Sequence, residues 1–191
     1  MKFGFVGACV REARFGLWCA QTIRSTLFAT LAIGAAWAAY PAQAQQPNFI
    51  GENGDWKAYT FKRGSETVCY MASAPEKATG DYSSRGRIYA LITNDPGQGV
   101  DNQFSIVTGY TYKKDSLVSV EIGGSRFELF TDDDKAWTRG PEEDANLIGA
   151  MIAGSNMIVE GSSSRGTVTM DTYSLIGFTA TKRVIDQACA S

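Results

Sequence analysis

From Trp56 onward, short runs of β-branched and aromatic residues alternate with clusters of Gly, Asn, Asp and Ser. Runs of this length, bounded by such turn residues, are typical of β-strands. The pattern predicts strands over residues 56–62, 67–74, 87–93, 103–112, 116–122, 125–130, 155–160 and 167–173. About eight short strands at this spacing predict a mainly β fold. We expect an antiparallel β-sandwich, with a barrel as the alternative.

The dipeptide Gly123-Gly124 predicts a tight hairpin, because a two-residue loop requires positive φ angles that glycine adopts without strain. A two-residue loop also determines the register of the two strands. Ile122 should therefore lie opposite Ser125, and Val120 opposite Phe127. One face of the hairpin then collects the apolar side chains Val118, Val120, Ile122, Phe127 and Leu129. The hairpin should be half buried.

Two stretches have the 3.6-residue period of helices. The first begins at Pro141, with acidic residues in its first turn, which suits the amino end of a helix. Its apolar stripe is Leu147, Ile148, Met151 and Ile152, and Gly154 should end it near residue 153. The second predicted helix covers about residues 178–188 at the carboxyl end, with Val184, Ile185 and Ala188 on one side.

The first 44 residues have the pattern of a cleavable secretory signal. A basic segment precedes the apolar run of residues 27–39, which is shorter than the roughly 20 residues needed to span a bilayer. Small residues at Ala42 and Ala44 suit signal peptidase, so we expect cleavage after Ala44. An uncleaved anchor is the alternative. Cleavage would leave a polar lead-in over residues 45–55 and a single domain over residues 56–191, without a membrane-spanning segment.

Cleavage at this position changes both the charge and the cysteine content of the chain. It removes four of the 18 basic and one of the 20 acidic residues, leaving 14 and 19 and a net charge of −5. A negative charge argues against nucleic acid as a partner. Cys69 and Cys189 remain as the only thiols and can pair in only one way. A disulfide is expected in an oxidising compartment, and two buried free thiols are the alternative.

The residues present restrict the chemistry that the domain could perform. The chain contains no histidine, the commonest general base and zinc ligand, so we expect no catalytic triad, no metal site and no cofactor. The acidic cluster Asp132-Asp133-Asp134 is the one candidate for carboxylate-dependent glycan hydrolysis. It lacks the alternate oxygen spacing of a calcium loop. We expect these acids to lie in a solvated turn.

Two features are candidates for binding a partner. The sequence Ser83-Ser84-Arg85-Gly86 recurs as residues 163–166, and each copy precedes a predicted strand. Both copies are explained as ordinary turns, but they could also present Arg85 and Arg165 to an anionic partner. Tyr110, Tyr112, Lys113 and Lys114 form the second candidate, an aromatic and basic recognition patch, with an ordinary strand end as its alternative.

Several stretches of the chain together resemble the invasion-associated locus B family of α-proteobacteria. They are GDWKAYTF from Gly54, VCYMASAPEKATGDYSSRG from Val68, GYTYKK from Gly109, FELFTDDDKAW from Phe127 and GSSSRGTVTMDTYSLIGFTA from Gly161. The resemblance covers nearly the whole chain after the signal, and its most specific part is the run with Tyr173 and Gly177 followed by Cys189. It implies a β-sandwich protein exported to the periplasm or the outer membrane, in a family named for host-cell invasion. No catalytic residues come with it.

These observations lead to one expected function and two alternatives. We expect an exported, non-enzymatic envelope protein that binds a macromolecular or surface partner, either a protein or another envelope component. A carboxylate-dependent envelope hydrolase is one alternative, and a secreted inhibitor or chaperone-like module is the other. The partner and the oligomeric state stay open, as does the choice between periplasm, outer membrane and exterior.

Overall fold

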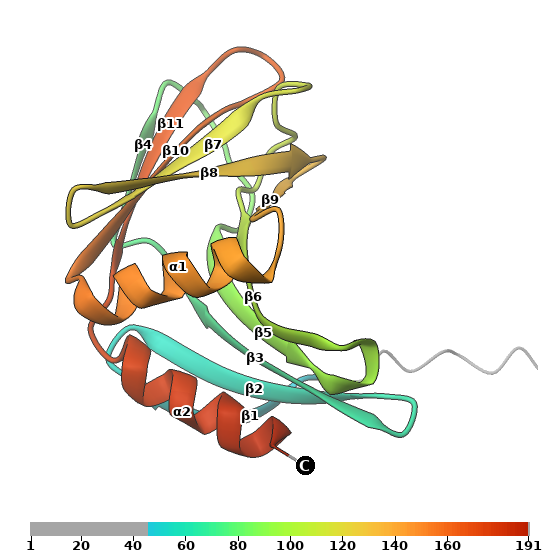
Figure 1. The fold of residues 1–191 in the computed structure, drawn as a ribbon. Helices are drawn as coiled ribbons and strands as arrows, with labels where there is room; N and C mark the ends of the chain where they lie inside the picture. Colours follow the sequence, from blue (N-terminus) through green and yellow to red (C-terminus); the bar gives the residue numbers. More distant parts are fainter. Residues whose placement is uncertain (1–45, 191) are drawn as a thin grey trace, which may run out of the picture. The chain divides into compact units, whose positions relative to one another are not determined.

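The computed structural model describes residues 46–190, which form one β-sheet and two α-helices (Figure 1). The strands are β1 (Asn48–Asn53), β2 (Trp56–Arg63), β3 (Glu66–Ser73), β4 (Lys77–Gly80), β5 (Tyr89–Asp95), β6 (Val100–Val107), β7 (Leu117–Ile122), β8 (Ser125–Asp132), β9 (Lys135–Trp137), β10 (Asn156–Ser162) and β11 (Val168–Ser174). The helices are α1 (Pro141–Ala153) and α2 (Phe178–Cys189), with a short 3₁₀ turn η1 (Pro96–Gln98). The signal predicted over residues 1–44 lies outside the described residues.

The strands form a single antiparallel sheet in the order β1-β2-β3-β5-β6-β9-β8-β7-β10-β11-β4. The mainly β prediction is therefore confirmed. The sandwich is not confirmed, because the eleven strands of the described region follow one another in one hydrogen-bonded order. In Figure 1 the sheet bends strongly, with β2, β3 and β5 below α1 and β7, β8 and β10 above it. A bent sheet of this kind brings strands from both halves to one core.

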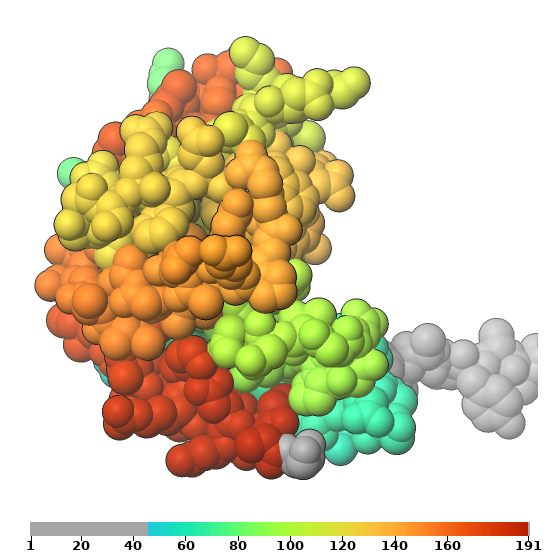
Figure 2. All heavy atoms as spheres, in the orientation of Figure 1, coloured from blue at the N-terminus to red at the C-terminus, as the bar shows by residue number. Residues whose placement is uncertain are grey.

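The core is one cluster of buried side chains from both halves of the sheet and from both helices. The Trp56 and Phe178 rings meet edge to face, with centroids 5.0 Å apart. The indole N–H of Trp56 donates to the carbonyl oxygen of Ser174 at 3.0 Å. These contacts join β2 to the end of β11 and the start of α2. The atoms of α1 (orange) fill the space between the β7–β8 hairpin (yellow) and α2 (red) in Figure 2.

Both predicted helices are confirmed, but one residue of each predicted apolar stripe is exposed, namely Ile152 in α1 and Ala188 in α2. Leu147, Ile148 and Met151 are buried as expected, but the Ile152 side chain is 51% exposed. The prediction for Ile152 is wrong because the buried stripe is centred near Asp144, Ile148 and Met151, and Ile152 lies at its outer edge. Residues 144, 147, 148 and 151 then complete the buried stripe of the helix without Ile152.

The predicted disulfide is confirmed. Cys69 in β3 is bonded to Cys189 at the end of α2, across a sequence separation of 120 residues. Cys69 is fully buried. The bond therefore attaches the last helix to an interior strand of the sheet.

The predicted hairpin at Gly123-Gly124 is also confirmed, with the expected register. Ile122 pairs with Ser125 and Val120 pairs with Phe127. Both glycines have positive φ, 56° and 84°. Val118, Val120, Ile122 and Leu129 are buried, and Phe127 packs against the core.

The structure also contains three strands, β1, β4 and β9, that the pattern of apolar residues does not predict. Strand β1 lies within the lead-in that we expected over residues 45–55, and it is the edge partner of β2. All four residues of β4 are exposed, so this strand has no apolar face to reveal it. Conversely, the strand predicted over residues 103–112 ends at Val107 as β6, because the chain turns at Gly109, where φ is +77°.

Candidate functional site

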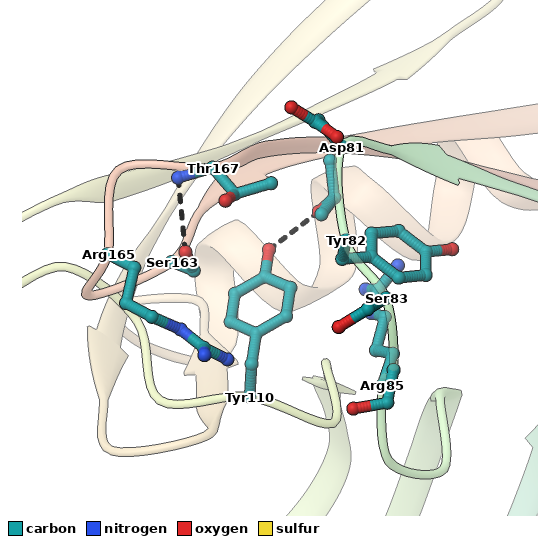
Figure 3. A pocket seen from close by; sticks show the side chains of 10 residues that line it. Asp81, Tyr82, Ser83, Arg85, Tyr110, Ser163, Arg165 and Thr167 are labelled. Atoms are coloured by element: carbon teal, nitrogen blue, oxygen red, sulfur yellow. Dashed lines mark hydrogen bonds between the residues drawn. The ribbon is translucent and has the colours of Figure 1, made fainter.

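The two Ser-Ser-Arg-Gly segments lie on opposite sides of one small pocket, although 80 residues separate them in the sequence (Figure 3). One segment precedes β5, and the other forms the turn between β10 and β11. The pocket has a volume of about 170 Å³. We call it the Arg165 pocket, and it is lined by Asp81, Tyr82, Ser83, Ser84, Arg85, Tyr110, Ser163, Arg165, Thr167 and Thr169.

The chain between β6 and β7 holds the two segments together. The backbone N–H of Gly86 donates to the carbonyl of Gly109 at 2.9 Å. Two residues further along this connection, the carbonyl of Thr111 accepts a hydrogen bond from the N–H of Ser164 at 2.8 Å. Gly86 and Gly109 approach so closely that a Cβ at Gly109 would lie 2.6 Å from the Gly86 carbonyl oxygen. This connection therefore sets the width of the pocket.

Arg85 is committed to an internal ion pair. Its guanidinium donates two hydrogen bonds to the carboxylate of Asp171 in β11, both at 2.6 Å. It donates two more to Thr108, at 2.6 Å to the carbonyl and 2.8 Å to the hydroxyl. The side chains of Arg85 and Asp171 are only 4% and 2% exposed. Four of the five N–H groups are thus used inside the protein.

The electrostatics of Arg85 follow from this pairing. Burial by itself lowers the pKa of Arg85, but the hydrogen bonds and the attraction of Asp171 outweigh it, so that the pKa is raised. Two tyrosine rings add to the stabilisation of the charge. The guanidinium carbon lies 4.9 Å from the centre of the Tyr110 ring and 5.7 Å from that of Tyr82. Arg85 is consequently part of the frame of the pocket.

Arg165 is in a different situation. Its side chain is exposed, and it makes no hydrogen bond or ion pair with any residue of the described region 46–190. In Figure 3 it extends from the β10–β11 turn along one side of Tyr110, and Asp81 lies at the far rim. Arg165 is therefore the cation of the pocket that is available to a ligand.

The tyrosines of the predicted recognition patch divide between the pocket and the core. Tyr110 lines the pocket, and its hydroxyl is 2.6 Å from the Thr169 hydroxyl. Tyr112 is only 4% exposed and belongs to the hydrophobic core, where burial raises the pKa of its phenol. Lys113 and Lys114 are exposed in the following turn and do not line the pocket. The four residues therefore do not form one surface.

The acidic cluster at residues 132–134 forms the turn of the β8–β9 hairpin. Asp132 pairs with Lys135, and Asp133 takes a left-handed conformation with φ at 51°. The Asp133 carboxylate accepts a hydrogen bond from the Thr111 hydroxyl at 3.0 Å. Within residues 46–190, no group of three or more Cys, Asp or Glu side chains is arranged to hold a metal ion. Asp132 lines a hollow of about 590 Å³ that Asp101 and Asp144 also line, whereas Asp133 and Asp134 do not line it.

Sequence reasoning missed the residues that hold the pocket in place, above all Asp171. Strand β11 places Thr169, Asp171 and Tyr173 inside and exposes Val168 and Met170 by 56% and 43%. Its alternation is therefore the reverse of the usual one, in which apolar residues face the core. An acid that shares a strand face with Tyr173 is the signal that could have identified a buried partner for an arginine.

The fold and the pocket define a class of protein, namely a disulfide-closed, mainly β domain with a small polar pocket that presents one arginine unpaired within the described region. Residues 56–185 match the model of the Invasion associated locus B (IalB) protein family. The chain therefore belongs to this family, as the resemblance in its sequence implied. Curated proteins include no match to the chain, and solved structures include none either. None of the described helices is long and apolar enough to cross a membrane.

Proposed function

We propose that this chain is an exported, non-enzymatic protein of the cell envelope that holds an anionic group of a partner in the Arg165 pocket. The observation that carries the proposal is the difference between two arginines with the same local sequence. Arg85 donates its hydrogen bonds to Asp171 and Thr108, whereas Arg165 has no partner within the described residues. The planar guanidinium of Arg165 suits a carboxylate or a phosphate.

The rest of the pocket supports the same assignment. Hydroxyl groups of Ser83, Ser163 and Thr167 line it and can donate hydrogen bonds to oxygen atoms. Asp171 is a buried carboxylate next to the pocket, and the positive charge of Arg85 neutralises it. Within the described region, an incoming anion therefore meets one free cation and several donors, while Asp81, the acid among the lining residues, is exposed at the rim.

Binding is favoured over catalysis by the residue types that are present. The chain has no histidine, so a Ser or Thr hydroxyl in the pocket lacks the commonest general base. The guanidinium of Arg165 serves as an electrostatic anchor for an anion. These residues can hold and orient an anion.

Export to the envelope is proposed on two grounds. The first 44 residues have the pattern of a secretory signal. The Cys69–Cys189 disulfide is of the kind that forms and persists outside the reducing cytoplasm. Contact with a host cell is included in the proposal because of the function for which the family is named. Fractionation of producing cells, combined with protease treatment of intact cells, tests the location. Recovery of the whole protein in the cytoplasmic fraction, protected from the protease, would contradict export.

Retention of partners from solubilised envelopes tests the binding role. The purified domain is immobilised as wild type, as Arg165→Glu and as Arg183→Glu. Arg183 is an exposed arginine in α2 and provides the matched charge control. We expect the wild type and Arg183→Glu to retain the same components, and Arg165→Glu to lose them. Equal retention by all three proteins would contradict the assignment of the pocket.

A further inference from the structure

A second surface, which shares no lining residue with the Arg165 pocket, carries three tyrosines on the outer face of β2, β3 and β5. We call it the tyrosine face and define it by Tyr59, Tyr70 and Tyr89, which line a hollow of about 780 Å³. The residues that alternate with them along these strands, such as Ala58, Met71 and Ala90, are fully buried in the core. The tyrosine side chains therefore point to the side of the sheet opposite the core.

The rings form a continuous aromatic row across neighbouring strands. Phe49 pairs with Tyr59, and Tyr59 pairs with Tyr70 in the register of the sheet. The Tyr59 and Tyr70 rings are stacked, with centroids 5.2 Å apart and planes inclined by 19°. The Phe49 ring meets Tyr59 edge to face at 5.7 Å and is itself 53% exposed. Tyr59 and Tyr70 are partly buried and cover each other's facing ring surfaces, so the row offers a ligand the ring surfaces and edges that stay exposed, above all at Phe49.

The hollow arises because small residues follow the tyrosines along β3. Ala72 pairs with Leu91 of β5, and Ala74 comes next on the same face. Tyr59 and Tyr70 therefore stand at one end of a depression whose floor is alanine, and Tyr89 stands on the neighbouring strand. The volume of about 780 Å³ lies within the range of roughly 300–1,000 Å³ that is usual for small-molecule sites.

Charged groups of both signs surround the aromatic row. Glu52, Asp55, Lys57 and Arg87 line the same hollow. The Lys57 ammonium is 3.5 Å from the Glu52 carboxylate, and both side chains are about half exposed, at 54% and 51%. A protein partner covering this hollow would have to desolvate these charges, which is costly. A ligand with many hydroxyl groups can instead bond to carboxylates as a donor and to Lys57 or Arg87 as an acceptor.

We propose that the tyrosine face binds an oligosaccharide. A sugar ring has an apolar face of C–H groups and an edge of hydroxyl groups, which matches partly exposed aromatic rings bordered by acids and bases. Burial, together with the proximity of Tyr59 and Tyr89, raises the pKa of Tyr70. The Tyr70 phenol therefore keeps its proton and can donate a hydrogen bond to a sugar oxygen. Single-stranded nucleic acid would also stack on such rings, but it needs a basic groove.

An oligosaccharide array followed by calorimetric titration tests this inference. The purified domain is applied to immobilised neutral, acidic and amino-sugar oligosaccharides, and the affinity for the best ligand is then measured in solution. We expect at least one ligand to bind, and Tyr59→Ala or Tyr70→Ala to weaken it at least tenfold. Tyr70→Phe keeps the ring and should weaken binding by less than either alanine variant.

Two control variants test whether the tyrosine face itself holds the sugar. Phe130 is a partly exposed aromatic residue that packs on Trp137 elsewhere in the sheet, so Phe130→Ala should leave sugar binding unchanged. With a neutral oligosaccharide, which has no anionic group for the Arg165 pocket, Arg165→Glu should also leave binding unchanged, and this distinguishes the inference from the proposed anion pocket. Absence of binding to every oligosaccharide would overturn the inference. Self-association of the domain that Tyr59→Ala abolishes would overturn it too, because the face would then be a contact between copies.

Discussion

Arg85 and Asp171 form a buried bidentate ion pair that joins the loop before β5 to strand β11. Both hydrogen bonds are 2.6 Å long, and the two side chains are almost completely excluded from solvent. The pair stabilises one wall of the Arg165 pocket, because it positions the loop that contains Tyr82 and Ser83. Its removal should therefore affect both the stability of the fold and the shape of the binding site.

Breaking this pair on one side should be severely destabilising. Arg85→Met leaves the Asp171 carboxylate buried without a partner, and such changes cost about 3–5 kcal/mol. Arg165→Met should change the free energy of unfolding by no more than about 0.5 kcal/mol, because that side chain is exposed. Urea denaturation of the two variants measures the difference. Equal stabilities would show that Arg85 is not a structural residue.

The sequence allowed prediction of features whose determinants are local. Gly123 and Gly124 specify a two-residue loop, and this alone determines the pairing of β7 with β8. Pro141 and the acids after it similarly mark the start of α1. The disulfide was predictable for a different reason, because only one pairing is possible once the cysteines of the predicted signal are set aside.

Other features depend on contacts that no local pattern records. Strands β1 and β4 are the two edges of the sheet, and β4 buries no side chain, so backbone pairing alone defines it. The two Ser-Ser-Arg-Gly segments were visible as a repeat. Their convergence on one pocket, however, depends on how Thr111 and Gly109 connect them. The opposite environments of Arg85 and Arg165 follow only from the position of Asp171.

Gly177 should be irreplaceable, in contrast to another glycine of the same domain. It begins α2 with φ at +86°, and a Cβ there would lie 1.9 Å from the Asn53 carbonyl oxygen. Gly177→Ala should therefore cost more than about 2 kcal/mol, since it combines a clash with a strained conformation. Gly149 lies exposed within α1 with open space around it, so Gly149→Ala should stabilise by about 0.5–1 kcal/mol. The midpoint temperature of thermal unfolding should fall for Gly177→Ala and rise for Gly149→Ala, relative to the wild type.

Loss of the disulfide should weaken the attachment of α2 and reduce overall stability. The bond closes a loop with a sequence separation of 120 residues, for which chain entropy predicts a contribution of roughly 5 kcal/mol. The double variant Cys69→Ala/Cys189→Ala should unfold at lower denaturant concentration than the oxidised wild type. Reduction of the wild type should reproduce the effect, and the double variant itself should not respond to reductant. The same midpoint of denaturant unfolding with and without the disulfide would contradict the prediction.

Asp144 should make the fold less stable as the pH rises from acid to neutral. Burial raises the pKa of Asp144 more than the hydrogen bonds from Thr138 and Phe104 lower it. The folded state therefore binds the proton more tightly than the unfolded chain. The resulting stabilisation is complete below the ordinary carboxyl pKa of about 3.9 and is lost as the pH rises through the raised value.

The variant Asp144→Asn isolates this contribution, because Asn keeps the oxygen that accepts both hydrogen bonds and cannot ionise. Unfolding free energies of both proteins are measured between about pH 3 and pH 7. The stability of the wild type relative to Asp144→Asn should fall across this range. A difference that stays constant or rises would show that the pKa of Asp144 is not raised in the folded protein.

Photo-crosslinking from the rim of the Arg165 pocket tests the central claim most directly. Tyr82→p-benzoylphenylalanine keeps an aromatic ring at a partly exposed position that lines the pocket. In producing cells, irradiation should yield a discrete adduct that Arg165→Glu abolishes and Arg183→Glu leaves unchanged. The same adduct in the presence of Arg165→Glu, or none with the otherwise wild-type chain, would contradict the account of this pocket as the binding site.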